Sequence, residues 1–177
     1  TYYSIGGGFV LTAAELEAAG GGKSKVKADV PYPFETADEM LAMAKSSGQS
    51  IAQMKLANEL KFRSKADIDK GIARLWEVMN HCISRGMEGT GILPGGLKVR
   101  RRAKGIHDAL IAERGLNMTA PHVINDWMSL YAMAVNEENA AGGQVVTAPT
   151  NGAAGVLPAV LRYYLDHVPG ASTNRIA

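Results

Sequence analysis

The chain has 177 residues, of which 46% are apolar and 20% charged, and its formal net charge at pH 7 is +2. This length and composition are typical of a globular domain that buries a core of its own. So small a charge argues against nucleic acid or an anionic membrane surface as the main partner, and the longest apolar runs are too short to span a bilayer.

Cys82 is the only cysteine of the sequence. A single cysteine excludes a disulfide framework and favours a reducing compartment, and one cysteine cannot form a Cys-rich metal site. No charged segment followed by a hydrophobic one opens the chain, which argues against secretion. We therefore expect a cytoplasmic protein.

The two ends of the sequence lead us to expect a piece of a longer protein. The chain opens with the β-prone stretch TYYSIGGGFV and no initiator methionine, and residues 173–177 follow without a clear terminal element. Frayed ends of a complete chain are the alternative interpretation.

Residues 1–33 differ in character from the rest. They contain strand-like segments at 2–5 and 9–11, six glycines and a short basic patch, and they end in the Pro-Tyr-Pro segment at 31–33. Each proline disfavours helix in the residue before it, so this segment is extended. We predict a boundary here, with residues 1–33 as the tail of an α/β or β domain and its linker, and residues 34–177 as a helical domain.

Three helix starts follow from local capping patterns. Thr36-x-x-Glu39 is a capping box that predicts a helix ending near Gly48, and Ser50-x-x-Gln53 predicts a second one. Ser64 caps a third, longer helix that Gly86 or Gly89 ends. Its apolar residues recur at spacings of three and four, which predicts one buried stripe with Cys82 as a buried structural thiol: Ile68, Ile72, Leu75, Met79, Cys82 and Ile83.

The second half of the chain continues the helical pattern. Residues 91–96 are expected to form a loop, and 99–112 a helix. Thr119 is the predicted cap of a further helix with Pro121 in its first turn. The glycine-rich stretch 142–155 interrupts the pattern, and a last helix is predicted from Pro158 to His167. In the helix that Thr119 is predicted to cap, the residues expected to face inward are Val123, Trp127, Leu130, Tyr131 and Ala134.

The strongest local signal for chemistry is NEENAAGG at 136–143, followed by TAPTNGAAG at 147–155. Glycines let a backbone approach a ligand closely. Thr150 or Asn151 is the expected N-cap of a helix whose first N–H groups suit a substrate carboxylate. Glu137, Glu138 and Asn139 could orient an amine or act in proton transfer. On physical grounds alone, a turn that only joins two helices is the simpler interpretation.

Other candidate sites carry weaker signals. Five basic residues lie within 98–104 without interleaved aromatics, which favours a solvated or ion-paired helix start over nucleic-acid binding. The four histidines lack metal-ligand spacing, and only His122, expected in a helix first turn, is of interest. Gly6-Gly7-Gly8 lacks the Gly-Lys-Ser/Thr ending of a phosphate-binding loop.

The longest motif, NEENAAGGQVVTAPTNGAAGVLPAVLRYY at 136–164, resembles the signature stretch of the catalytic α domain of bacterial iron–sulfur-dependent L-serine dehydratases. YYSIGGGFV resembles the end of that family's β domain. The VPYPF, HCISRGM and LPGGLKVRRRA segments fall in the family's order, so the resemblance covers essentially the whole chain. It implies a mainly α catalytic-domain fragment preceded by the strand-containing tail of an α/β domain.

The resemblance also implies a reaction. These enzymes convert L-serine to pyruvate and ammonia, with a [4Fe–4S] cluster whose open iron acts as a Lewis acid on the substrate hydroxyl. The family's cluster cysteines and its Ser-rich, His-containing motif lie outside the present sequence, so we expect the chain alone to be inactive. The expected substrate-binding residues are Thr147, Thr150, Asn151 and Gly152, with Asn139 as a weaker candidate.

The resemblance further implies partners, namely L-serine, the remainder of the same enzyme and further copies of it in a homo-oligomer. The alternative function is a non-catalytic module that binds a small carboxylate, such as an amino acid, or regulates another protein. A continuation of the parent protein into a cysteine-bearing segment would favour the enzyme.

Overall fold

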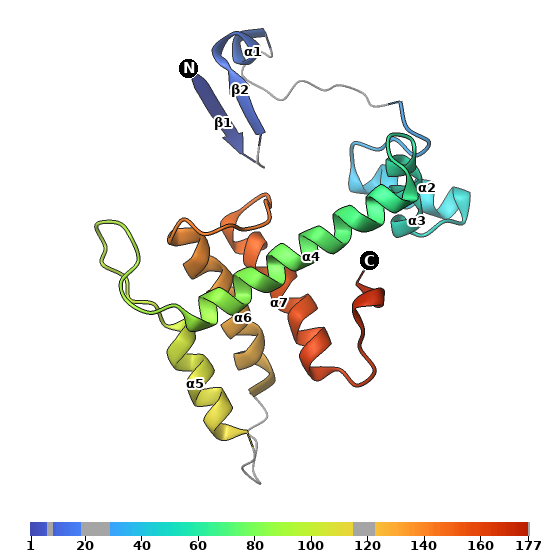
Figure 1. The fold of residues 1–177 in the computed structure, drawn as a ribbon. Coiled ribbons are helices and arrows are strands. Elements are labelled where there is room, and N and C mark those ends of the chain that lie inside the picture. Colours follow the sequence, from blue (N-terminus) through green and yellow to red (C-terminus); the bar gives the residue numbers. More distant parts are fainter. Residues whose placement is uncertain (7–8, 19–28, 115–122, 177) are drawn as a thin grey trace.

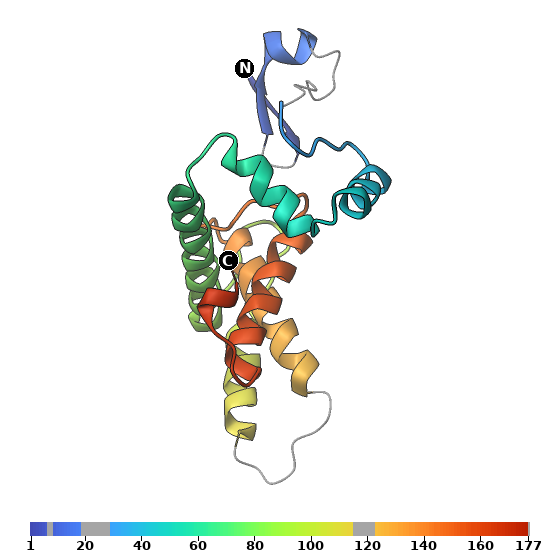
Figure 2. The same ribbon diagram turned by 90° about the vertical axis from the view of Figure 1, so that its right-hand side faces the viewer.

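The computed structural model describes residues 1–6, 9–18, 29–114 and 123–176 (Figures 1 and 2). Helices make up most of the described chain, which confirms the mainly α prediction. The elements in order are β1 (Tyr2–Gly6), β2 (Phe9–Thr12), α1 (Ala13–Ala18), α2 (Ala37–Ser47), α3 (Ile51–Leu60), α4 (Lys65–Glu88), α5 (Ala103–Glu113), α6 (Val123–Ala140), α7 (Asn151–His167) and the 3₁₀ turn η1 (Thr173–Arg175).

The N-terminal strands form an antiparallel pair in which Tyr2 lies opposite Thr12. Both predicted strands are therefore present. The short helix α1, which the sequence pattern did not predict, follows β2 directly. The Thr12 hydroxyl accepts from the Glu15 N–H at 3.3 Å, and Glu15 Oε2 accepts from the Thr12 N–H at 2.8 Å, so α1 begins with a reciprocal cap. The proposed domain boundary after residue 33 remains a prediction.

Both predicted capping boxes are formed. Thr36 Oγ1 accepts from the Glu39 N–H at 3.2 Å, and Ser50 Oγ accepts from the Gln53 N–H at 3.2 Å, each with the reciprocal bond from the N-cap N–H. Helix α2 ends at Gly48, whose φ of 69° is the left-handed conformation that glycine adopts at lowest cost. These caps explain why two short helices can follow one another here.

Helix α4 is the longest element, and its C-terminal half packs against α6 and α7 (Figure 1). Ser64 caps its start as predicted, and of the two predicted stops Gly89 is correct, because Gly86 lies inside the helix. Gly86 is buried against α6. A Cβ at this position would lie 2.3 Å from the Ala134 carbonyl oxygen. The two helices therefore touch through backbone at this point.

The predicted buried stripe of α4 holds only in part. Ile68, Met79, Cys82 and Ile83 are buried and Ile72 is half-buried, whereas Leu75 is 49% exposed, so the prediction for Leu75 was wrong. The N-terminal half of α4 extends beyond the helices that cover its other half (Figure 1). The spacing of apolar residues shows which face of a helix is apolar. A residue on that face is buried only where another element packs against it.

Helix α6 is the centre of the core and contacts α4, α5 and α7. Trp127, Leu130, Tyr131 and Ala134 are buried as predicted, and Val123 is half-buried against the same cluster. The buried core comprises Cys82, Ile83, Met87, Ala103, Leu110, Trp127, Leu130, Tyr131, Ala134, Val135 and Ala159.

Two predicted helix starts were wrong. Helix α5 begins at Ala103 rather than at 99, because residues 91–101 form a hairpin-like loop in which Leu93 N–H donates to Val99 O at 2.8 Å and Arg101 N–H to Gly91 O at 2.9 Å. Helix α7 begins at Asn151, in agreement with the predicted N-cap at Thr150 or Asn151 but not with the predicted start at Pro158, which lies inside the helix. Thr119, Pro121 and His122 lie outside the described residues.

Candidate functional site

The N-terminus of α7 has the geometry of an open helix end. Thr150 has extended backbone angles (φ −141°, ψ 160°), and its hydroxyl accepts from the Ala153 N–H at 3.1 Å. Thr150 is therefore the N-cap, one of the two predicted. Within the described part of the chain, the N–H groups of Asn151 and Gly152 donate to no acceptor. Two N–H groups thus remain available at the positive end of a 17-residue helix.

Gly152 leaves open space beside these N–H groups. A Cβ built at Gly152 would meet only Thr150 Oγ1, at 3.9 Å, which is ordinary van der Waals contact. Thr147, Thr150, Asn151 and Gly152 are all exposed. A small anion can therefore approach this turn from solvent without moving the protein.

The predicted site residues fall into two groups. Thr150, Asn151 and Gly152 lie together in the first turn of α7. Asn139 is half-buried in the last turn of α6, where its carbonyl accepts from the Gly142 N–H at 3.1 Å. Among the described residues no hydrogen bond joins the side chains of Asn139 or Thr147 to the first turn of α7.

Glu137 is occupied by the protein itself. Its side chain is buried, and it accepts from the Arg102 N–H at 2.7 Å and from the Ala103 N–H at 3.3 Å. It therefore caps α5 from a neighbouring helix and supplies negative charge at its N-terminus. Glu137 is not free to orient a substrate amine, contrary to that part of the sequence prediction.

Glu138 is the centre of a buried ion cluster. Its carboxylate contacts Arg101 Nη1 at 2.7 Å and Arg85 Nη2 at 2.9 Å, and the Arg101 side chain is only 11% exposed. The Glu138 carbonyl accepts from the Gly143 N–H at 2.8 Å. A Cβ at Gly143 would lie 2.8 Å from Glu138 Oε2 and 3.0 Å from the Glu138 carbonyl oxygen, so a side chain there would displace the clustered carboxylate.

Two of the five basic residues in segment 98–104 form ion pairs in the structure. Arg101 is turned inward to Glu138, and Lys104 pairs with Asp108 at 2.7 Å within α5. The predicted ion-paired helix start is thus confirmed for both residues. The roles of Arg85 and Arg101 had no local signal in the sequence, because their partner lies on a distant helix.

A surface cavity of about 330 Å³ lies beside the cluster. Arg85, half of whose side chain is exposed, connects the two. The cavity is lined by one side of α4 and by one residue of the α6–α7 turn: Arg74, Glu77, Val78, His81, Arg85 and Gln144.

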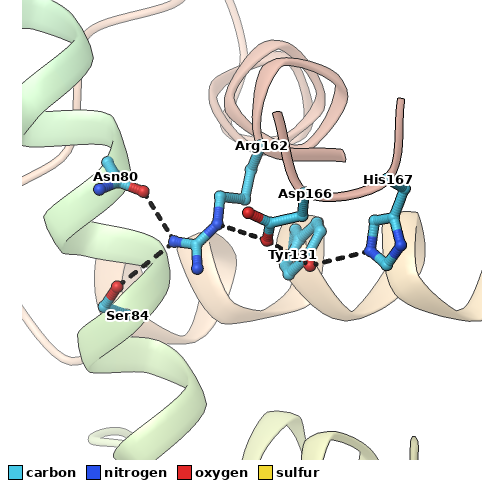
Figure 3. Close-up of polar contacts among 6 residues, drawn as sticks. All are labelled: Asn80, Ser84, Tyr131, Arg162, Asp166 and His167. Atoms are coloured by element: carbon cyan, nitrogen blue, oxygen red, sulfur yellow. Dashed lines mark hydrogen bonds and ion pairs between the residues drawn. The ribbon is translucent and has the colours of Figure 1, made fainter. Parts of the chain in front are cut away.

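A second polar network joins α4, α6 and α7 at the other end of α7 (Figure 3). The Tyr131 hydroxyl donates to Asp166 Oδ2 at 2.8 Å and lies 3.3 Å from His167 Nε2. Arg162 donates to Asp166 at 2.7 Å and to Asn80 Oδ1 at 2.7 Å. These bonds fix the rotation of α7 about its axis.

Burial sets the protonation of this second network. It lowers the pKa of His167 below its ordinary value, with Asp166 opposing and Arg114 and Arg162 reinforcing the shift. Burial, and then the hydrogen bond to Asp166, raises the pKa of Tyr131. At neutral pH the imidazole and the phenol are therefore both uncharged.

Cys82 has the chemistry of a structural thiol rather than of a metal ligand. It is 3% exposed, and burial, followed by the charge of Glu138, raises its pKa to about 11. Cys82 lies within the hydrophobic core cluster, where its side chain packs as a small apolar group. In the described ranges no three His, Cys, Asp or Glu side chains are grouped to hold a metal ion.

Within the part of the chain that the structure describes, no helix is long and apolar enough to cross a membrane. The fold and the turn thus define a helical unit whose last long helix opens, after a glycine-rich turn, with two available N–H groups. The family model described as "Serine dehydratase alpha chain" matches residues 39–176. The chain belongs to this family.

Curated relatives agree along nearly the whole chain. An L-serine dehydratase of Streptomyces coelicolor is 50% identical over 177 residues, which are 99% of this chain and 37% of the relative. L-serine dehydratase TdcG of Escherichia coli is 50% identical over 93% of this chain and 35% of its own length. L-serine dehydratase 2 of the same organism is 42% identical over 100% of this chain and 38% of its own. The chain therefore spans little more than a third of these relatives.

Proposed function

We propose that the full-length protein containing residues 1–177 dehydrates L-serine to pyruvate and ammonia, and that these residues supply one part of its substrate site. The observation that carries the proposal is the 50% identity to a protein named L-serine dehydratase over 99% of this chain. The open first turn of α7 lies within the motif on which the sequence resemblance rests.

In this proposal the first turn of α7 binds the substrate carboxylate. The N–H groups of Asn151 and Gly152 donate to it, and the helix dipole adds a favourable interaction with the negative charge. The Thr150 cap holds the turn in place through the Ala153 N–H. The Thr147 hydroxyl and the Asn139 amide are the proposed flanking contacts to the bound amino acid.

We further propose that the full-length protein carries a [4Fe–4S] cluster on cysteines outside residues 1–177. In this proposal Cys82 is a structural residue and not one of the ligands, because it is enclosed in the hydrophobic core. The chain by itself is then expected to be inactive. The full-length protein is expected to work in the cytoplasm as a homo-oligomer and to supply pyruvate to central metabolism.

The test is pyruvate release from L-serine by the full-length protein purified without oxygen. Activity that is lost in air and restored by iron with a reductant would support both the reaction and the cluster. An anaerobic protein that binds L-serine but releases no pyruvate would overturn the proposal and favour the module that only binds a small carboxylate.

A further inference from the structure

Arg85 contacts both Glu138 and the turn that leads to the proposed substrate site. Its Nη2 atom bonds Glu138 Oε2 at 2.9 Å, and the same atom would lie 3.4 Å from a Cβ at Gly143. The next residue, Gln144, lines the surface cavity together with Arg85. One guanidinium on α4 therefore lies against the end of α6 and the first part of the α6–α7 turn, residues 141–149.

Few other contacts fix this turn. The Glu138 carbonyl accepts from the Gly143 N–H at 2.8 Å, and Val145 packs against the hydrophobic core. Among the described residues, no hydrogen bond joins segment 144–149 to another part of the chain. The position of Gly143 is therefore one of the few constraints on how the chain reaches the first turn of α7.

The two arginines of the cluster bind different oxygens of one carboxylate. Arg101 Nη1 bonds Glu138 Oε1 at 2.7 Å, and the Arg101 side chain is only 11% exposed. This buried counter-charge already offsets the single negative charge of Glu138. Arg85 bonds Oε2, the oxygen that would lie 2.8 Å from a Cβ at Gly143. The second guanidinium therefore adds orientation rather than neutralisation, because it fixes the oxygen against which the turn packs.

Arg85 is also open to solvent. Its side chain is 49% exposed and lines a cavity of about 330 Å³, whereas Arg101 is enclosed at Gly89, where a Cβ would clash with its guanidinium. Loss of the Arg85 side chain leaves no buried charge unpaired, because Arg101 still binds Glu138. Breaking a buried pair is costly chiefly because one buried charge loses its partner. The fold should therefore tolerate the loss of Arg85 better than the loss of Glu138.

We propose that Arg85 is a positioning residue for the substrate site. It holds Glu138 Oε2 and Gly143 in place, and so sets the path by which the chain reaches the first turn of α7. Arg85 does not itself contact the substrate. The inference rests on the proposed function, because it assumes that the first turn of α7 binds the carboxylate of L-serine. It adds to that function a residue of α4 that no local sequence pattern connects with the turn.

The first test compares Arg85→Ala with Arg74→Ala in the full-length protein. Arg74 lies on the same face of α4 and lines the same cavity, but it pairs with Glu77. A displaced turn weakens substrate binding without changing the chemical step, so KM rises while kcat is retained. We expect the KM for L-serine to rise about tenfold in Arg85→Ala, as for the loss of one hydrogen bond to a charged group, and to stay unchanged in Arg74→Ala. A lower unfolding midpoint with an unchanged KM would show a purely structural role for Arg85 and overturn the proposal.

The second test is chemical rescue of Arg85→Ala. Methylguanidinium carries the same planar fork of donors as the arginine side chain, and the space that the variant vacates opens onto the cavity. Saturating methylguanidinium should lower the KM of Arg85→Ala toward the parent value, whereas methylammonium, which lacks the fork, should not. Neither cation should change the KM of Gly152→Ala. Absence of rescue by methylguanidinium, or equal rescue by methylammonium, would contradict the proposal.

Binding measured without turnover separates this inference from the proposed function. Calorimetry gives the Kd for L-serine of the parent, Arg85→Ala and Arg85→Lys, and the lysine variant, which keeps the charge but not the fork, should lie between the other two. Should Arg85→Ala not fold, the parent and Arg85→Lys still give the comparison. Equal Kd values would overturn the positioning role whether or not pyruvate is released. The expected order of Kd values without pyruvate release would support the positioning role and contradict the proposed function alone.

Discussion

Gly152 allows a test that separates ligand binding from protein stability. A Cβ there fits the protein, with its nearest atom 3.9 Å away, but it would occupy the space proposed for the substrate carboxylate. Gly152→Ala in the full-length protein is expected to raise the KM for L-serine roughly tenfold, equivalent to about 1.5 kcal/mol, the lower end for a hydrogen bond to a charged group. Steady-state kinetics and thermal unfolding measure the two effects.

The matched control for this prediction is Gly105→Ala, also in a helix first turn with no atom within 4 Å of the built Cβ. Both substitutions remove conformational freedom from the unfolded chain and should leave stability unchanged or raise it by about 0.4–1 kcal/mol. Only Gly152→Ala should change KM. An unchanged KM in both variants would show that the first turn of α7 does not bind the substrate.

Glu138 is the residue on which the turn after α6 depends. Glu138→Gln leaves the buried Arg101 and the neighbouring Arg85 without a counter-charge, and breaking a buried pair in this way costs about 3–5 kcal/mol. Glu77→Gln is the control, because its exposed pair with Arg74 contributes at most about 1 kcal/mol. Thermal unfolding of the full-length protein should give a much lower midpoint for Glu138→Gln alone. Similar midpoints would mean that the cluster is well solvated.

At the scale of elements, the close contact between α4 and α6 depends on Gly86, which has no side chain. Gly86→Ala would place a Cβ 2.3 Å from the Ala134 carbonyl oxygen, so the two helices must separate. Such overpacking costs about 1–3 kcal/mol. Gly71→Ala, in the same helix with open space around its Cβ, should instead stabilise by about 0.4–1 kcal/mol.

The free energy of unfolding from denaturant titration distinguishes the two glycine variants, which should change stability in opposite directions. Loss of stability in both would indicate a general intolerance of α4 to substitution. A neutral Gly86→Ala would mean that α4 and α6 are packed less closely than the structure indicates.

Local chemistry explains which helix ends were predictable. The caps at Thr36, Ser50, Ser64 and Thr150 act within three residues along the chain, so the sequence pattern shows them directly. The start of α5 is capped by Glu137, 34 residues away from Ala103. No local pattern reveals a cap that comes from another helix, and the predicted start was therefore four residues too early.

The candidate site was likewise predictable only where its contacts are local in the sequence. The open first turn of α7 follows from Thr150 and the glycines beside it, and was predictable. The Glu138 cluster was not, because Arg101 and Glu138 are 37 residues apart and charge alone does not select partners. Leu75 was assigned to the core from periodicity, yet it is 49% exposed.

At the scale of the whole molecule, the network around Tyr131 makes the packing of three helices sensitive to acid. The folded-state pKa of His167 lies below its ordinary value of 6.5. The unfolded chain therefore takes up a proton more readily, and this contribution to stability is present above about pH 6.5 and is lost as pH falls through the folded-state pKa.

Acidification from about pH 7.5 to about pH 5.5, across the ordinary titration range of histidine, should lower the unfolding midpoint of the full-length protein. His167→Gln keeps a polar group near the Tyr131 hydroxyl and removes the titration, so its midpoint should depend less on pH. His81→Gln, at an exposed position of α4, is the control. Equal pH dependence in the variant and the parent would exclude His167 as the source.

The Glu138 cluster joins three segments that are far apart in the sequence. Its arginines come from α4 and from the loop before α5, and neither can reach the carboxylate until α6 has packed against α4 and α5. Contacts between distant segments form only after the entropy of closing the intervening loops has been overcome. The Gly143 turn is therefore held over the cluster by contacts between segments that are far apart in sequence, whereas the first turn of α7 beside it is held by the local Thr150 cap.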